Sequence, residues 1–375
     1  MKSTTLASPT GSFVEKAIQR RWLGKAFLIL VAALATWKLG VSLIENPTLF
    51  IQQVLNGLQL GFVYALIALG YTMVYGIVRL INFAHGDVFM VGAFTSYYAI
   101  TRFELNLWLS KLIPGTPEWL SLGVGTVTVV LLAMVVCAFL AVVIERVAYK
   151  PLRNAPRISA LITAIGVSFF LEYFGALEFV YTPNFITYQR PFPVSTWVIG
   201  SQGIFKLQPG VAAPEGSVIF SSIAMIIIIS SIFLLALLQF VVQKTRIGKA
   251  MRATAYDKPT ARLMGINVDG IISITFAIGA ALAGAAGVLY AIAFPQVFFW
   301  MGIIPGLKAF VAAVLGGIGS IPGALVGALI MGQAEVLSAG YISTPMRDAI
   351  AFTILIFVLL VRPTGIFGEP EREKA

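Results

Sequence analysis

The sequence of 375 residues has few charged side chains and almost none of the groups that build metal or nucleophile sites. Asp, Glu, Lys and Arg together make up 11% of the chain, whereas soluble proteins average about 25%. One cysteine, Cys137, excludes an intramolecular disulfide, and with one histidine, His85, it excludes a zinc site of the usual kind. A G-x-x-x-x-G-K-[ST] segment for nucleotide phosphate is also absent. The sequence therefore contains few side chains that could serve an enzyme as catalytic groups.

Apolar residues, in contrast, account for 58% of the chain. A water-soluble fold of this length cannot hide so much apolar surface. Several runs also reach the roughly 20 residues that a helix needs to cross a bilayer. The sequence therefore predicts an all-α fold, a polytopic bundle of transmembrane helices. The predicted spans are 26–45, 51–76, 82–100, 121–144, 158–181, 218–242, 271–293 and 346–361.

A Gly-rich stretch between the last two spans complicates their count. Residues 307–331 are largely apolar but are interrupted at "LGGIGSIPG" (315–323). If the stretch enters and leaves on one side, the chain has about eight spans plus a broken or re-entrant helix pair; if it crosses twice, it has ten. The predicted divisions are an N-terminal cytoplasmic tail with an extra first span (1–48), a transmembrane domain (49–366) and a C-terminal cytoplasmic tail (367–375).

Basic residues gather in three polar segments, which are the N-terminal tail, the loop at 146–157 and the segment 244–262. The loops at 102–120 and 183–216 are poorer in Lys and Arg. Because basic loops stay on the cytoplasmic side, both termini are predicted to be cytoplasmic. The net charge of +10 then reflects orientation and not nucleic-acid binding. The Pro-rich loop at 183–216 is expected to be an ordered external loop and not a domain.

The segment "RIGKAMRATAYDKPTARLMGINVDG" (246–270) is a polar island between two apolar spans. Asp257 can cap a helix whose first turn contains Pro259, and Gly265 can end that helix in a left-handed conformation. A preceding short helix is expected over 247–255. Small side chains would let a partner approach closely; they are Ala253, Ala255 and Ala261. The segment is either a polar loop at the lipid headgroups or a docking surface, and two capped helices favour docking.

Polar groups also occur at the start of an apolar span, in "INFAHGD" (81–87). Asn82, His85 and Asp87 are either a cap and hydrogen-bond cluster near the cytoplasmic interface or part of a pathway or gate, since ionisable groups in a bilayer are costly. Glu172, isolated in "SFFLEYF", is either an interior hydrogen-bond acceptor or a pathway residue.

The broken Gly-rich segment offers the same choice between structure and pathway. The helix is interrupted at Gly316, Gly317 and Pro322. A small-residue face for close helix contact is formed by Gly319, Gly323 and Gly327. Unwound backbone at membrane depth is tolerated only where it is buried or lines a cavity, so the segment is either a gate element or a tight helix hairpin. Lys308 and Glu335 flank it and could pair with each other.

Several of these stretches resemble a known family. "NGLQLGFVYALIALGYTMVYGIVRLINFAHGD", "ALITAIGVSFFLEYF", "RIGKAMRATAYDKPTARLMGI", "LKAFVAAVLGGIGSIPGALVGALI" and "RPTGIFG" look like segments of the membrane permeases of bacterial branched-chain amino acid ABC importers. The resemblance covers most of residues 51–369. It implies the ABC importer permease fold and a multi-pass transport subunit of the inner membrane that is not an enzyme.

The resemblance also implies partners and roles. Such permeases pair with a second homologous permease or a second copy, two cytoplasmic ATPase subunits and a periplasmic substrate-binding protein, within membrane lipid. ATP-Mg is then held by the ATPases, and this chain binds no cofactor. The implied ATPase-coupling segment contains Arg252, Ala253, Asp257, Lys258, Pro259, Ala261, Arg262 and Gly265. The pathway or gate candidates are Asn82, His85, Asp87, Glu172, Gly316, Gly317, Gly319 and Pro322.

Two other functions remain open at this point. Urea-type permeases share "NFAHG"-like and Gly-rich stretches, so the chain could serve a urea or short-amide importer. An ion-coupled secondary transporter would need intramembrane carboxylates or unwound backbone, for which Glu172 and the broken segment are the candidates.

Overall fold

The computed structural model of the protein describes residues 37–38, 40–153, 155–200, 203–208, 210–362 and 364–368. The predicted N-terminal tail, most of the predicted first span and residues 369–375 of the C-terminal tail lie outside these ranges. The chain divides into two compact units, Met1–Gln52 and Gln53–Ala375. In the first unit, residues 40–45 and 47–52 are helical. The second unit contains the rest of the helical bundle.

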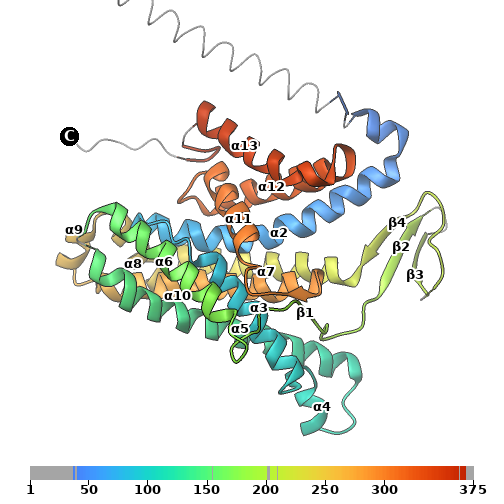
Figure 1. Cartoon of the computed structure of the whole chain (residues 1–375), viewed down its shortest axis with the longest axis horizontal. Helices are drawn as coiled ribbons and strands as arrows, with labels where there is room; N and C mark the ends of the chain where they lie inside the picture. Colours follow the sequence, from blue (N-terminus) through green and yellow to red (C-terminus); the bar gives the residue numbers. More distant parts are fainter. Residues whose placement is uncertain are drawn as a thin grey trace, which may run out of the picture. The chain divides into compact units, whose positions relative to one another are not determined.

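Most of the second unit is helical, and its helices follow the predicted spans closely (Figure 1). By length and composition, six described helices could cross a membrane. These are α2 (Pro47–Val78), α5 (Glu118–Ile144), α6 (Arg157–Gly175), α7 (Ser222–Lys244), α10 (Val268–Ala293) and α12 (Ile321–Tyr341). Shorter helices are α3 (His85–Thr101), α4 (Trp108–Leu112), α8 (Arg246–Tyr256), α9 (Lys258–Leu263), α11 (Ile303–Gly316) and α13 (Arg347–Val361). Helix length and composition do not show which of the shorter helices cross the membrane, so the count of about eight spans stays a prediction.

The core of the bundle is formed where α10 packs against α3 and α5. Glycines let these helices approach closely, because a Cβ at Gly92 in α3 would lie 2.6 Å from the Cα of Gly284 in α10. A Cβ at Gly284 would in turn lie 2.9 Å from the sulfur of Cys137 in α5. Small residues commonly bring transmembrane helices together in this way, since lipid provides no hydrophobic driving force between them. The contact of the three helices therefore depends on backbone proximity at two glycines.

Substituting Gly92 by valine should separate α3 from α10 and sharply lower the yield of folded protein. The inserted side chain meets backbone atoms, which cannot move aside as a flexible side chain could, and overpacking of this kind costs about 1–3 kcal/mol or more. Gly166→Val in α6 is the matched control, because nothing lies within 4 Å of a Cβ there. Size-exclusion profiles of the two detergent-solubilised variants would check this. Equal monodisperse yields would contradict the close contact.

Helices α3 and α11 both begin inside the bundle and not at its ends. Residues 79–84 leave the end of α2 without helical structure, and His85, the first residue of α3, packs against Gly70. Gly70 lies eight residues before the end of α2, which corresponds to roughly 12 Å of helix. At the same place, a Cβ on Gly86 would lie 2.6 Å from the carbonyl oxygen of Gly302, just before α11. The first turns of α3 and α11 therefore meet at depth.

The broken Gly-rich segment forms a tight hairpin of α11 and α12. Ser320 caps α12 by accepting a hydrogen bond from the Gly323 amide (3.2 Å), and Pro322 lies in the first turn. A Cβ on Gly323 would lie 2.5 Å from the Gly316 carbonyl oxygen. Gly317 adopts φ of +107° and Gly319 of +99°, values that favour glycine. The hairpin alternative describes the geometry of these residues, and a gating role stays a prediction.

Residues beyond α13 close this hairpin turn. The amides of Ile366 and Phe367 donate hydrogen bonds to the carbonyl oxygens of Leu315 and Gly316, both at 2.9 Å. They satisfy acceptors at the end of α11 that the helix itself leaves unpaired. The "RPTGIFG" stretch therefore has a structural role, as a strap across the end of α11.

The all-α expectation needs one correction, in the Pro-rich loop. The described residues of this loop include β1 (Ile186–Thr187), β2 (Thr196–Gly200) and β3 (Gly203–Leu207), and β4 (Val218–Ser221) follows directly after it. The last three form an antiparallel sheet in the order β3-β2-β4, while β1 pairs with β5 (Gln296–Val297). Alternating apolar residues in the strands, as in "TWVIG" and "GIFKL", explain the sheet. Consequently α7 begins at Ser222, later than the predicted 218.

Candidate functional site

The polar island folds into the predicted pair of capped helices, α8 and α9. The Asp257 side chain accepts a hydrogen bond from the Thr260 amide (3.2 Å), and Pro259 lies in the first turn of α9. Gly265 follows the helix with φ of +80°. Thr245 caps α8 by accepting from the Gly248 amide (3.1 Å). The caps confirm the helices that the sequence predicts, with α8 beginning one residue earlier.

The exposed surface of this pair differs from the prediction. Ala261 is 3% exposed and faces the protein, so the expectation that it lies on an accessible docking surface is wrong. Large apolar side chains project outward instead: Tyr256 is 82% exposed, Leu263 88% and Met264 78%. We call these three residues the apolar patch. Small alanines pack α8 and α9 against the bundle, and this leaves longer side chains to face outward.

A cavity of about 720 Å³ lies behind α9, between that helix and the bundle. Its walls come from the end of α2, the segment between α5 and α6, and the first turns of α9 and α10. Cationic side chains dominate its polar lining; they are Arg79, Arg153, Lys258 and Arg262. Glu145 is the acidic lining residue. We call this space the basic cavity.

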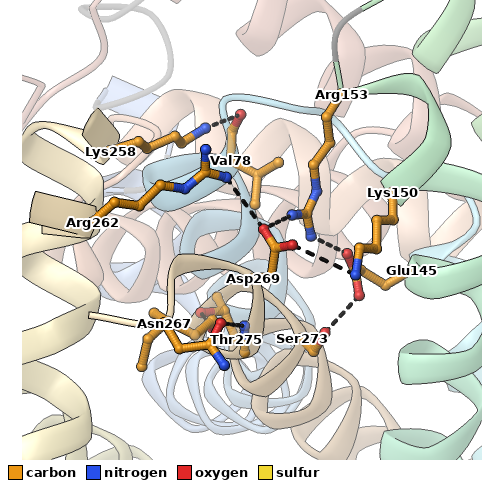
Figure 2. A network of polar contacts seen from close by, with 12 residues as sticks. Val78, Glu145, Lys150, Arg153, Lys258, Arg262, Asn267, Asp269, Ser273 and Thr275 are labelled. Atoms are coloured by element: carbon orange, nitrogen blue, oxygen red, sulfur yellow. Dashed lines mark hydrogen bonds and ion pairs between the residues drawn. The ribbon is translucent and has the colours of Figure 1, made fainter. Parts of the chain in front are cut away.

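Ion pairs beside the basic cavity connect α9 to three other elements (Figure 2). Asp269, in the first turn of α10, accepts from Arg153 (2.6 Å) and Arg262 (3.4 Å) and lies 3.5 Å from the Lys150 ammonium. Arg153 also pairs with Glu145, which is 1% exposed and begins η2 (Glu145–Tyr149), a π-helix at the end of α5. The Asp269 carboxylate of α10 therefore connects α9, through Arg262, to η3 (Lys150–Leu152), through Lys150.

A second contact fixes the π-helix to α10. The Ser273 hydroxyl donates a hydrogen bond to Glu145 at 2.6 Å. π-Helical turns inside longer helices are uncommon and often occur at functional sites. The polar network therefore connects α9 to η2, at the end of α5, and to the first turns of α10.

The side chains of "INFAHGD" point to three different neighbours. Asn82 accepts a hydrogen bond from the Tyr149 hydroxyl (2.6 Å), and the His85 ring packs edge-on against Tyr71 at 4.7 Å between ring centroids. Asp87 accepts from the Ser168 hydroxyl (2.5 Å), and the buried Glu172 lies four residues after Ser168 on the same helix, α6. All of the motif's polar side chains are buried.

The place of this cluster along its helices bears on the two alternatives. The structural alternative placed it near the interface, yet Ser168 lies eleven residues beyond Arg157, roughly 16 Å along α6. That is about half of a 30 Å hydrocarbon core. The cause is the non-helical segment 79–84, which carries the chain inward before α3 begins.

Some members of the site were missed at the level of sequence. Glu145 and Asp269 organise the ion pairs, and neither is among the candidate residues that the sequence predicts. A signal was present for both. Glu145 is the lone acidic residue beside Arg146, Lys150 and Arg153, and Asp269 lies where a helix N-terminus favours an acidic side chain.

Membrane-length apolar helices around a buried core, with a capped polar helix pair against one cavity, define a polytopic integral membrane protein. Residues 53–359 match the sequence model of the family described as "Branched-chain amino acid transport system / permease component". The chain belongs to this family. It is a transport permease and not an enzyme.

Curated relatives agree with the family match. The chain is 44% identical over 334 residues to the high-affinity branched-chain amino acid transport system permease protein LivH of Escherichia coli K12, covering 88% of this chain and 99% of the relative. It is 39% identical to BraD of Pseudomonas aeruginosa over 87% and 98%. The autoinducer 2 import system permease protein LsrC of Shigella flexneri matches at 31% over 35% and 40%. No solved structure matches the chain.

Proposed function

We propose that the protein forms the membrane pathway of an ATP-driven importer for branched-chain and other hydrophobic amino acids. The observation that carries this proposal is the near full-length similarity to branched-chain amino acid permeases. Similarity to the autoinducer permease covers only 35% of the chain, so that substrate is not favoured. Neither the urea-type nor the ion-coupled alternative gains support from the relatives.

Two cytoplasmic ATPase subunits would power the transport, and ATP-Mg would be held there, since the permease has no phosphate-binding loop of its own. We propose that α8 and α9 dock on these subunits through the apolar patch. Three large apolar side chains that are almost fully exposed on an otherwise polar segment support this docking role, because exposed apolar surface on a polar background often marks an interaction site. The Asp269 ion pairs would then transmit the movement of α9 to α10 and η2.

The pathway itself would run past the first turns of α3 and α11. Residues 79–84 and 294–302 are largely non-helical, and Gly302 lies against Gly86 in the first turn of α3. Irregular backbone at membrane depth is tolerated where it is buried or lines a cavity, and discontinuous helices of transporters commonly mark the substrate route. Asp87 and Glu172 lie on the α6 side of this region.

The orientation proposed here places α8, α9 and the basic cavity in the cytoplasm, at the inner face of the bacterial inner membrane, as their basic residues favour. The α11–α12 turn reaches the same end, because Gly319 lies against Gly76 near the end of α2. This supports two crossings for 294–341 and ten in total, with both termini cytoplasmic. A substrate-binding protein would dock outside, and a second homologous permease or a second copy would complete the pathway.

Uptake measurements with the complete importer test the substrate assignment. Membrane vesicles carrying the permease, its ATPases and its binding protein should accumulate radiolabelled leucine only with ATP. Unlabelled isoleucine and valine should compete, whereas urea should not. Competition by urea would favour the short-amide alternative. Accumulation without ATP, driven by an ion gradient, would instead favour the secondary transporter.

A further inference from the structure

Among the described residues that line the basic cavity, cationic side chains outnumber carboxylates. Among its lining residues, Arg79, Arg153, Lys258 and Arg262 face the single carboxylate of Glu145. Asp269, next to the cavity, is already shared by Arg153 and Arg262 and by Lys150. Cations that converge on a partly enclosed space repel one another unless an anion lies between them. The lining therefore has the composition of an anion-binding site.

Lys258 shows most clearly that a positive charge in the cavity lacks a carboxylate partner among the described residues. Its ammonium lies 3.5 Å from the Val78 carbonyl oxygen, and none of the described carboxylates forms an ion pair with it. Burial, followed by the neighbouring Arg153, Arg79 and Arg262, holds the pKa of Lys258 below its usual value. An anion in the cavity would relieve both effects at once.

Arg79 adds a conformational argument. It has a φ of +62°, in the left-handed region that few residues other than glycine adopt. Such conformations persist where the surroundings enforce them and often occur at ligand sites. Here the turn ends α2 and lets Arg79 line the cavity. The free-energy cost of this left-handed backbone conformation is thus associated with placing the Arg79 guanidinium at the wall of the basic cavity.

The remaining walls connect the cavity to the lipid. Ile158 and Leu161, near the start of α6, line it and are also 67% and 36% exposed. Their outer surface continues along α6 as exposed apolar side chains, including Ile162 and Ile165. A polar head in the cavity could therefore keep its acyl chains along α6. A soluble anion would use only the basic part of this surface.

We propose that the basic cavity binds the phosphate headgroup of an anionic phospholipid, wedged behind α9 with its acyl chains along α6. Basic pockets between transmembrane helices on the cytoplasmic side are suited to such headgroups. The lipid would bridge α2, α9 and the segment between α5 and α6, and would thereby support the ion pairs through which α9 moves α10. The proposal rests on the proposed orientation, which places this end at the inner leaflet.

Native mass spectrometry of the full-length, delipidated protein titrated with dioleoylphosphatidylglycerol tests this directly. We expect one tightly retained lipid, whose affinity falls roughly fivefold in Arg79→Gln, the change typical of one cation at a membrane surface. Arg79→Lys, with the same backbone conformation and charge, should keep the affinity. Lys244→Gln is the matched control, because Lys244 is exposed in the last turn of α7 and does not line the cavity. Thermal melts would verify folding of each variant.

Other outcomes would overturn the proposal. Equal lipid binding by Arg79→Gln, Lys244→Gln and the unaltered protein would show that the cavity is not the lipid site. Displacement of the lipid by inorganic phosphate would assign the cavity to a free anion, and displacement by leucine would assign it to the transported substrate. The measurement needs no transport, so failure of the substrate assignment leaves it interpretable.

Discussion

Replacing Leu263 and Met264 together by aspartate is expected to abolish ATP-dependent leucine uptake while the permease stays folded. Both side chains are almost fully exposed, at 88% and 78%, so their loss removes little internal packing. Burying an apolar side chain of this size at an interface is worth about 1.5–3 kcal/mol. Losing two should weaken ATPase docking by at least a hundredfold. Co-purification of the ATPase with the tagged permease, together with vesicle uptake, measures both consequences.

Leu112→Asp supplies the matched control for the apolar patch. Leu112 is also exposed, at 69%, but lies in α4, away from the α8–α9 pair in the sequence. This variant should retain the ATPase as the unaltered permease does. If the double aspartate variant also retained the ATPase and transported leucine normally, α9 would not be the docking element. The contrast avoids Ala261, whose buried position would confuse docking with misfolding.

The second large effect is expected from Lys308→Met in α11. The Lys308 ammonium is held between the carboxylates of Glu335 and Asp348, each at 2.7 Å, and its side chain is 2% exposed. Glu335 also accepts a hydrogen bond from the Tyr64 hydroxyl at 2.9 Å. Removing this cation leaves the two carboxylates with only Arg347, which lies 3.5 Å from each and is half-exposed. Breaking a buried ion pair costs about 3–5 kcal/mol. Thermal unfolding in detergent should show a large fall in midpoint.

Two comparisons give this prediction its control. Lys111→Met breaks the ion pair with Glu104, whose partners are 58% and 56% exposed, and should change the midpoint little. Glu335→Gln should be milder than Lys308→Met, because Lys308 keeps Asp348. A Lys308→Met variant as stable as Lys111→Met would show that the buried pair contributes nothing to the fold.

Local chemistry made much of this fold predictable. Apolar length identified the long helices, and the cap at Asp257, the proline at 259 and the glycine at 265 predicted α9 within a residue. The pairing of Lys308 with Glu335 was also foreseen, because a lone charge inside a bilayer needs a partner. In each case the deciding interaction is local or there are very few possible partners.

Contacts between distant segments were not predictable in the same way. Asp87 and Ser168 are 81 positions apart in the sequence, and their side chains meet because 79–84 carries the chain inward. Nor did periodicity reveal which side of α9 faces the bundle, since a helix of six residues is too short to show an amphipathic pattern. The apolar patch therefore emerged only from the exposed fractions of its side chains.

The brevity of α11 has a consequence for membrane insertion. Its 14 residues are fewer than the roughly 20 that a helix needs to span the hydrocarbon alone, and it carries Lys308, a costly residue to place there. Insertion of α11 by itself during synthesis is therefore unfavourable. Together with α12 it can enter as a preformed unit in which Glu335 already neutralises the lysine. We therefore expect the buried ion pair to govern the order of assembly, with the hairpin inserting only after α12 has left the ribosome.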